Sequence, residues 1–191
     1  MQILSVLAHP RRGSLTGAAF DRLNAGLQAA GHLGTEADLT AEGFDPRLGP
    51  EDEPDWDDAT KVYSPAVQRE MDRIRAHQAI VMTFPVWWWS LPALLKGWID
   101  RVWNRGFAYG GGASLSTHKA LMVGLAAGGA ATYDGARGYR AAMEIQLTQG
   151  VLDYCGIAGG RLALLFDSTG SDAERARLLE QAEALGRGFP S

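Results

Sequence analysis

The stretch that most constrains this chain is residues 84–92, which read Phe-Pro-Val-Trp-Trp-Trp-Ser-Leu-Pro. Residues 79–83 before it form an apolar run with the length of a buried strand. Ser90 is expected to cap a helix that follows, with Pro92 in the first turn. The sequence therefore predicts a strand, a tight aromatic turn and an amphipathic helix. The apolar face of this helix repeats at helical spacing through Leu91, Leu94, Leu95, Trp98, Ile99 and Val102.

The aromatic turn, residues 85–91, is expected to face a ligand. In an open parallel sheet, ligands bind beyond the carboxyl ends of the strands, where this turn lies. The three consecutive tryptophans cannot all pack inward, so at least one of them should face a cleft. A flat indole ring in a cleft can cover a flat ligand.

The composition limits the class of protein. A chain of 191 residues can bury a full core, so residues 1–191 are expected to form a single domain. The net charge of −4 gives no electrostatic basis for binding nucleic acid or an anionic membrane. Cys155 is the single cysteine, and no apolar run is long enough for a membrane span or a signal peptide. We therefore expect a cytoplasmic protein that does not insert into a membrane.

Four further apolar runs have the length of strands, at residues 3–8, 33–39, 119–127 and 161–166. Ser14 is expected to cap a helix that ends at Gly31, and Ser171 with Glu174 forms a capping box for the last helix. Helices are also expected over residues 67–74 and 139–154, and residues 130–138 are expected to form a loop. Residues 41–64 lack periodicity, and their acidic residues are expected to lie in a solvated loop. Five strands alternating with five helices predict an α/β, doubly wound parallel sheet.

Several classes of enzyme are excluded by missing motifs. The chain has no G-x-G-x-x-G after its first strand, no P-loop and no G-x-S-x-G, and its four histidines are too scattered to predict a metal site. The remaining alternative is a flavodoxin-like fold, with strand order 2-1-3-4-5 and a flavin between strands 1 and 3. That order brings together the loops at residues 9–14, 85–91 and 126–133. The first of them is either an anion site with Arg11 and Arg12 nearby or an ordinary turn.

The central stretch resembles the NAD(P)H:quinone oxidoreductase family of flavodoxin-like flavoproteins. The most specific matches are F-P-V-W-W-W, L-P-A-L-L-K-G-W-I-D-R-V and G-F-A-Y, within residues 84–109. Residues 7–10, 128–129 and 154–156 give weaker support, and the resemblance covers nearly the whole chain. It implies that a bound flavin takes a hydride from NADPH or NADH and reduces a quinone, or a similar flat electrophile, by two electrons.

The resemblance also implies roles for single residues. Trp88 and Trp89 would line the nicotinamide and quinone pocket, and Tyr109 and Tyr154 would reach that substrate pocket from the partner subunit of a homodimer. Tyr133 and Tyr139 are candidate catalytic donors to the oxygen on which negative charge develops. Cofactor binding is expected of His9, Ser14, Leu15, Thr16, Pro85, Val86, Trp87, Trp88, Trp89, Ala126, Ala127, Gly128, Gly129 and Tyr133.

Departures from the family pattern concern the cofactor. Ala126 and Ala127 stand where the family has paired threonines, so only backbone contacts remain there. Met71 stands where the family often has a glutamine that touches the flavin, and Tyr139 stands near the place of an assisting histidine. The long insert before Met71 resembles the FAD-binding members. We therefore expect FAD, with FMN as the alternative.

Two other functions compete with this reading. Relatives act as ancillary subunits of potassium-efflux transporters, so a regulatory subunit of a membrane transporter is one alternative, with residues 41–64 as its docking segment. A one-electron flavodoxin is the other. The modest negative charge and the tryptophan-walled pocket argue against a one-electron flavodoxin.

Overall fold

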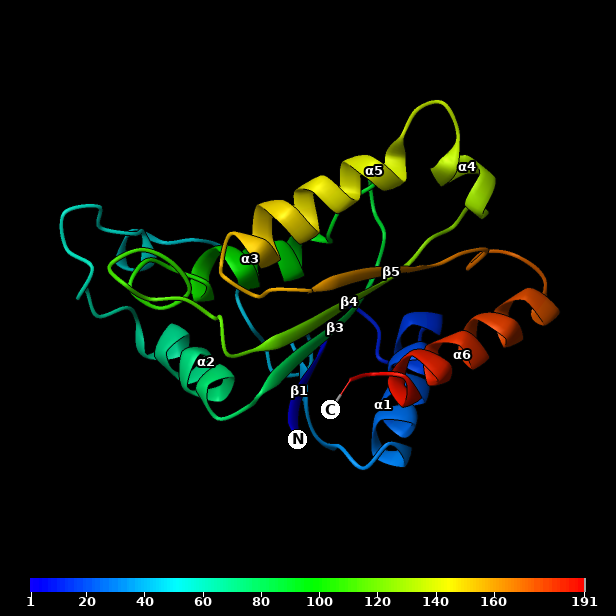
Figure 1. Ribbon diagram of the computed structural model, residues 1–191, viewed down its shortest axis with the longest axis horizontal. Helices are drawn as coiled ribbons and strands as arrows, with labels where there is room; N and C mark the ends of the chain where they lie inside the picture. Colours follow the sequence, from blue (N-terminus) through cyan, green and yellow to red (C-terminus); the bar gives the residue numbers. More distant parts are fainter. Residues whose placement is uncertain (191) are drawn as a thin grey trace.

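The computed structural model describes residues 1–190, in which one parallel sheet lies between two layers of helices (Figure 1). The strand order is β2-β1-β3-β4-β5. The strands are β1 (Gln2–Leu7), β2 (Leu33–Asp38), β3 (Ala79–Pro85), β4 (Lys119–Leu125) and β5 (Arg161–Leu165). The predicted strands and their flavodoxin-like order are confirmed, since each predicted boundary lies within two residues of the observed one.

Helices cover both faces of the sheet (Figure 1). On one face lie α1 (Leu15–Ala29) and α6 (Asp172–Arg187), and on the other lie α2 (Pro65–Arg75), α3 (Ala93–Val102) and α5 (Tyr139–Glu144). The helix predicted over residues 139–154 continues beyond α5 as the π-helix η2 (Ile145–Asp153). The predicted caps are present: Ser14 accepts the N–H of Gly17, and Ser171 and Glu174 form the capping box.

Successive side chains of each strand point to opposite faces of the sheet, so a hydrophobic core forms on each face. All of β3 is buried, as expected for a central parallel strand covered by helices on both faces. The face towards α2 and α3 carries Leu4, Val6, Ile80, Met82 and Met122. The face towards α1 and α6 carries Ile3, Ala79, Val81, Leu121 and Val123.

The insert at residues 41–64 is anchored to α3. It contains the short 3-10 helix η1 (Pro50–Asp52), in which Asp52 is fully buried. The Asp52 carboxylate lies 2.6 Å from the guanidinium of Arg101 and accepts hydrogen bonds from the N–H and the hydroxyl of Ser64. The prediction of a solvated acidic loop is therefore wrong for Asp52, because these donors replace water around its charge.

Two further local predictions are wrong. Pro92, and not Ser90, occupies the N-cap position of α3. Ser90 instead closes the aromatic turn, and its hydroxyl donates to the side chain of Gln146 at 3.2 Å. Part of the loop predicted at residues 130–138 is the short helix α4 (Ala130–Asp134).

Met71 is buried in the core, which removes its side chain from any contact with a cofactor at the sheet edge.

Within residues 1–190, no helix combines the length and the apolar character that crossing a bilayer requires. The helices are instead amphipathic and pack one face on the sheet. In α2, for example, Val67, Met71 and Ile74 are buried while Asp72 and Arg75 are exposed.

Candidate functional site

The loops after β1, β3 and β4 lie at the carboxyl edge of the sheet, and two ring contacts join them. The ring centroids of His9 and Trp87 are 6.2 Å apart, which links the first loop to the aromatic turn. Trp89 stacks on Tyr139 at 4.3 Å with an interplanar angle of 19°, which links the turn to the segment after β4. The N–H of Val86 also donates to the carbonyl of Leu125 at 2.8 Å, which sets the turn beside the loop that begins at Ala126, so the structure brings the three predicted loops together.

The aromatic turn holds Trp88 and Trp89 in a strained conformation. The backbones of Trp87 and Ser90 exchange two hydrogen bonds, and the two tryptophans between them have φ values of +53° and +54°. Positive φ at both central positions is the pattern of a type I′ turn, which favours asparagine and glycine. A bulky residue there costs about 1–3 kcal/mol, and Trp88, which is 89 % exposed, regains little of this by packing. Backbone strain at two exposed tryptophans indicates a surface that binds a ligand.

His9 is fixed by its surroundings. Its Nδ1 lies 3.0 Å from both the N–H and the carbonyl oxygen of Arg11, and the hydroxyl of Thr40 donates to the His9 carbonyl at 2.9 Å. Burial lowers the pKa of His9 below its usual value, against the hydrogen bond with Arg11, which favours the neutral ring. When Nδ1 accepts from Arg11, Nε2 carries the proton and can donate to an oxygen of a ligand.

The start of α1 supplies backbone donors but only one free arginine. Ser14 is engaged as the cap, and Thr16 is buried in the first turn. Arg12 turns back along α1, where it pairs with Asp21 and donates to the carbonyl of Gly17. Arg11 therefore remains as the guanidinium of this loop without a side-chain partner in the described part of the chain. This loop can therefore still bind an anion through its backbone N–H groups, but only Arg11, and not Arg12, is available to add a positive charge.

The loop after β4 presents free backbone donors. Ala126 extends the sheet by donating its N–H to the carbonyl of Leu165 at 2.8 Å. The N–H groups of Ala127, Gly128 and Gly129 have no acceptor among residues 1–190. This loop therefore offers a ligand backbone contacts alone, as the two alanines predict.

The two candidate donors sit in different surroundings. Tyr133 is 5 % exposed, its ring lies 5.3 Å from that of Phe166, and burial raises its pKa. Tyr139 faces the aromatic turn, and its hydroxyl accepts a hydrogen bond from Arg137 at 3.1 Å. That acceptance leaves the hydroxyl proton of Tyr139 free to be donated elsewhere.

Tyr109 and Tyr154 lie together, away from the aromatic turn of their own chain. Their ring centroids are 5.5 Å apart, and Trp56 of the insert lies 6.4 Å from Tyr109. A continuous helical segment, α5 and η2, leads from Tyr139 at the turn to Tyr154. Gln146, which accepts a hydrogen bond from Ser90 of the turn, lies eight residues before Tyr154, which is about 12 Å along this segment at the rise of a helix. The structure therefore does not bring Tyr154 to the aromatic turn within one chain.

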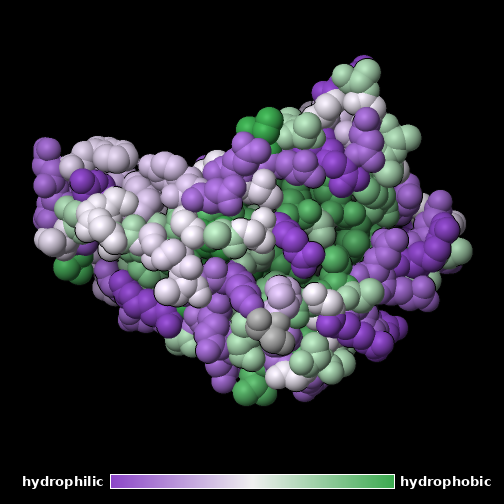
Figure 2. All heavy atoms as spheres, in the orientation of Figure 1, coloured by the Kyte–Doolittle hydropathy of each residue, from purple (hydrophilic) through white to green (hydrophobic). Residues whose placement is uncertain are grey.

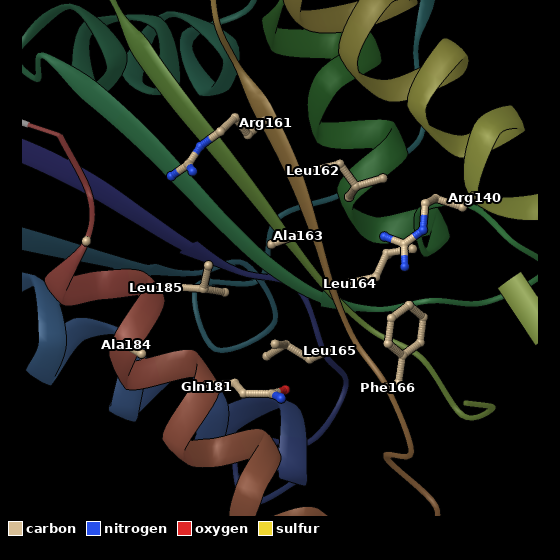
Figure 3. Close-up of a pocket in the computed structure, with 11 residues that line it drawn as sticks. Arg140, Arg161, Leu162, Ala163, Leu164, Leu165, Phe166, Gln181, Ala184 and Leu185 are labelled. Atoms are coloured by element: carbon tan, nitrogen blue, oxygen red, sulfur yellow. The ribbon is translucent and has the colours of Figure 1, made fainter. Parts of the chain in front are cut away.

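A groove of about 600 Å³ runs along the free edge of β5, between this strand and α6 (Figure 3). Figure 2 shows the same area as a hydrophobic surface between α5 and α6. Its polar side chains are those of Arg140, Arg161 and Gln181, and none of the site residues predicted from the sequence lines it. Without an acid, a histidine or a nucleophile, the size of this groove does not make it the reactive site.

Three residues that shape or extend the site have no role predicted from the sequence. Thr40 and Thr169 follow the outer strands β2 and β5, and each hydroxyl donates to a carbonyl of a neighbouring inner loop. No local motif marks such threonines, because their partners become neighbours only through the order of the strands. Trp56, by contrast, stands out as a single tryptophan in an acidic insert, and this signal was available in the sequence.

The chain belongs to a family described as having a flavodoxin-like fold, since the model of that family matches residues 1–187. The uncharacterized NAD(P)H oxidoreductase YcaK of Escherichia coli (strain K12) is 44 % identical over 127 residues, 66 % of this chain and 65 % of the relative. NAD(P)H dehydrogenase (quinone) 1 of Rattus norvegicus is 27 % identical over 175 residues, 80 % of this chain and 64 % of the relative. The chain thus spans slightly less than two thirds of the length of these two relatives.

A solved structure matches the chain over its whole length. The NAD(P)H:quinone oxidoreductase from Methanothermobacter marburgensis superposes with a TM-score of 0.93 at 28 % identity, over 100 % of this chain and 96 % of that chain. The fold and the resemblance predicted from the aromatic turn are both confirmed by these comparisons.

Proposed function

We propose that this protein is a flavin-dependent NAD(P)H:quinone oxidoreductase that reduces quinones, or similar flat electrophiles, by two electrons. The observation that carries the proposal is the strained, exposed tryptophan turn beside the β1/β3 switch point of the sheet. The three proteins compared above are described as an NAD(P)H oxidoreductase, an NAD(P)H dehydrogenase (quinone) and an NAD(P)H:quinone oxidoreductase, which supports the same reaction class.

The residues at this edge fit a flavin, which joins a flat ring system to a polar chain ending in phosphate. The aromatic turn, Pro85 to Trp89, offers planar rings to the ring system, and the free N–H groups of residues 127–129 suit its carbonyl oxygens. His9 Nε2 and the N–H groups at the start of α1 suit the polar chain and the phosphate. We propose FAD as the cofactor, and the same loops can hold FMN.

The bound flavin would take a hydride from NADPH or NADH and pass two electrons to the quinone. The residues of the chain bind, orient and supply hydrogen bonds. Trp88 and Trp89 form the wall against which the nicotinamide and the quinone stack in turn. The hydroxyl of Tyr139, oriented by Arg137, is placed to donate towards an oxygen on which charge develops. Tyr133 is proposed as the second donor.

We further propose a homodimer with shared sites. Tyr154 lies eight residues, or about 12 Å along the helix, beyond Gln146, which Ser90 of the aromatic turn of its own chain contacts, and it is 65 % exposed. In a dimer with twofold symmetry, such a residue can complete the site of the partner subunit. Ile145 and Trp88, which are 59 % and 89 % exposed, offer apolar surface to a second copy.

Neither competing function gains support. The relatives named above are described as oxidoreductases and not as transporter subunits. The insert that was the docking candidate is tied to α3 through Asp52 and Arg101. A cytoplasmic location belongs to our proposal, because NADPH and NADH are available there.

The test is quinone reduction by the flavin-loaded protein with NADPH or NADH under anaerobic conditions. We expect one reduced nicotinamide to be consumed per quinone, without release of a quinone radical. Trp88→Ala and Tyr154→Ala should each lower kcat/KM by about 10-fold or more. Leu33→Ala, at an exposed residue of β2, is the matched control and should leave kcat/KM unchanged. A flavin-loaded protein that reduces no quinone with either nicotinamide would contradict the proposal.

A further inference from the structure

We infer that the loop after β5, residues 167–169, is a positioning element for the cofactor, and that the hydroxyl of Thr169 is its central group. The inference rests on the proposed function, because it concerns how the chain presents residues 126–129 to a flavin. Three consecutive carbonyls of the loop after β4 (residues 126–129, the β4 loop) accept hydrogen bonds from the loop after β5 (residues 167–169, the β5 loop). The pairs are Ser168 N–H to Ala126 at 2.9 Å, the Thr169 hydroxyl to Ala127 at 3.0 Å and Asp167 N–H to Gly128 at 3.3 Å.

These three bonds set the direction of the free donors. In a trans peptide, the carbonyl of one residue and the N–H of the next point in opposite directions. Because the carbonyls of residues 126–128 point to the β5 loop, the N–H groups of Ala127, Gly128 and Gly129 point away from it. In the observed strand order, the side away from β5 is that of β3 and β1. The β5 loop thus directs three N–H groups without an acceptor in residues 1–190 towards the proposed flavin.

Thr169 holds the β4 loop with a side-chain hydrogen bond that the alanines of this loop cannot make. Ala126 and Ala127 have no side-chain group with which to hold their own turn. Among the described residues, the Thr169 hydroxyl makes the one side-chain hydrogen bond to residues 126–129. Thr169 is itself exposed at the surface, so its hydroxyl is not needed to fill the core. Its role is therefore to orient a backbone that the flavin would contact.

Asp167 turns the chain so that the β5 loop can reach these carbonyls. Its φ is +60°, in the left-handed region that aspartate tolerates better than most residues. Gly170 donates its N–H to the Asp167 carbonyl at 2.9 Å, which closes the turn. The loop is thus a hydrogen-bonded turn with a defined direction, as positioning requires.

The test compares two variants of Thr169 in their affinity for FAD and FMN, titrated into the apoprotein and followed by flavin fluorescence. Thr169→Val keeps the shape and removes the hydroxyl, whereas Thr169→Ser keeps the hydroxyl. We expect Thr169→Val to bind flavin about 2- to 10-fold more weakly than the wild type. Thr169→Ser should bind as the wild type does. The matched control is Thr117→Val, at an exposed threonine beside the opposite end of β4, which should leave affinity unchanged.

A second readout addresses the donors directly and needs no activity. In amide NMR spectra of the apoprotein, the signals of Gly128 and Gly129 should move in Thr169→Val and stay in place in Thr169→Ser. The melting temperature of each variant apoprotein should equal that of the wild type, because Thr169 is an exposed residue. A loss of fold therefore cannot imitate the effect.

The outcomes separate this inference from the proposed function. If the wild type binds flavin and Thr169→Val binds it equally well, the positioning role is wrong and the proposed function stands. Equal losses of affinity in Thr169→Val and Thr169→Ser would also overturn the role, since the hydroxyl would not be the cause. A wild-type protein that binds neither FAD nor FMN would overturn both.

Discussion

Trp88 occupies a backbone conformation that favours asparagine, with φ at +53° and 89 % of its surface exposed. Trp88→Asn should therefore raise the free energy of unfolding of the apoprotein by about 1 kcal/mol, because asparagine relieves the strain and little packing is lost. The same change should weaken quinone binding. Urea denaturation and the KM for a quinone measure the two effects. Val62→Asn is the control, since Val62 is also exposed but has no positive φ. A Trp88→Asn protein less stable than the wild type would contradict the reading of the turn as strained.

Burial shifts the pKa values of two groups near the aromatic turn, Tyr133 and His9, away from pH 7. Burial raises the pKa of Tyr133 above the ordinary value of about 10, and burial lowers the pKa of His9 below about 6.5. We therefore predict that kcat/KM has no catalytic ionisation between about pH 6.5 and 8. Tyr133→Phe and Tyr139→Phe should each slow flavin reduction, by up to about 10²-fold, while flavin stays bound. A rate that falls sharply below pH 7 in the wild type, with both phenylalanine variants still fast, would assign the role to His9.

At the scale of elements, the insert is held to α3 by the buried pair of Asp52 and Arg101. Burial by itself raises the pKa of Asp52, but hydrogen bonds from Arg101 and Ser64 outweigh it and leave the pKa below its ordinary value. A carboxylate with a lowered folded pKa adds stability above its unfolded pKa of about 3.9 and loses it as the pH falls. The anchoring of the insert should therefore weaken below about pH 4.

Asp52→Asn tests this anchor. The change leaves the Arg101 charge buried without its partner, so the free energy of unfolding at pH 7 should fall by about 3 kcal/mol. The variant should also lose the part of the acid dependence that Asp52 contributes. Asp57→Asn, at an exposed residue of the same insert, is the control. Urea denaturation at pH 7 and about pH 3 measures both effects, and equal stability of Asp52→Asn and the wild type at pH 7 would show that the pair is not an anchor.

Sequence patterns predicted the elements well because their determinants are local. Apolar runs marked all five strands, and Ser14 and Ser171 marked the starts of α1 and α6. The aromatic turn predicted the place of the site because its residues are adjacent in the chain. Features that depend on distant partners were missed. Asp52 resembles the other acids of the insert until Arg101, 49 residues later, pairs with it, and the contact of Thr169 depends on β5 lying beside β4.

At the scale of the whole molecule, the distance between Tyr154 and its own aromatic turn predicts complementation between subunits. Trp88→Ala and Tyr154→Ala should each keep about one tenth of the wild-type kcat/KM or less as homodimers. Mixed after unfolding and refolding, they should recover about one quarter of wild-type activity, because half of the dimers carry one intact site of two. A mixture of Trp88→Ala with a second turn variant, Trp89→Ala, is the control and should recover nothing. No recovery in the first mixture, or a fully active monomer by light scattering, would contradict shared sites.

One flavin per chain, at the edge formed by β1, β3 and β4, is the feature on which the proposed reaction depends. The direct measurement is the ratio of flavin to chain in the purified protein, with the flavin released by heat and identified, and with the apoprotein then titrated with FAD and FMN. We expect a yellow protein with about one flavin per chain, and weaker binding in Trp87→Ala, whose ring lies beside His9. A colourless protein that binds neither added FAD nor added FMN would contradict the central claim.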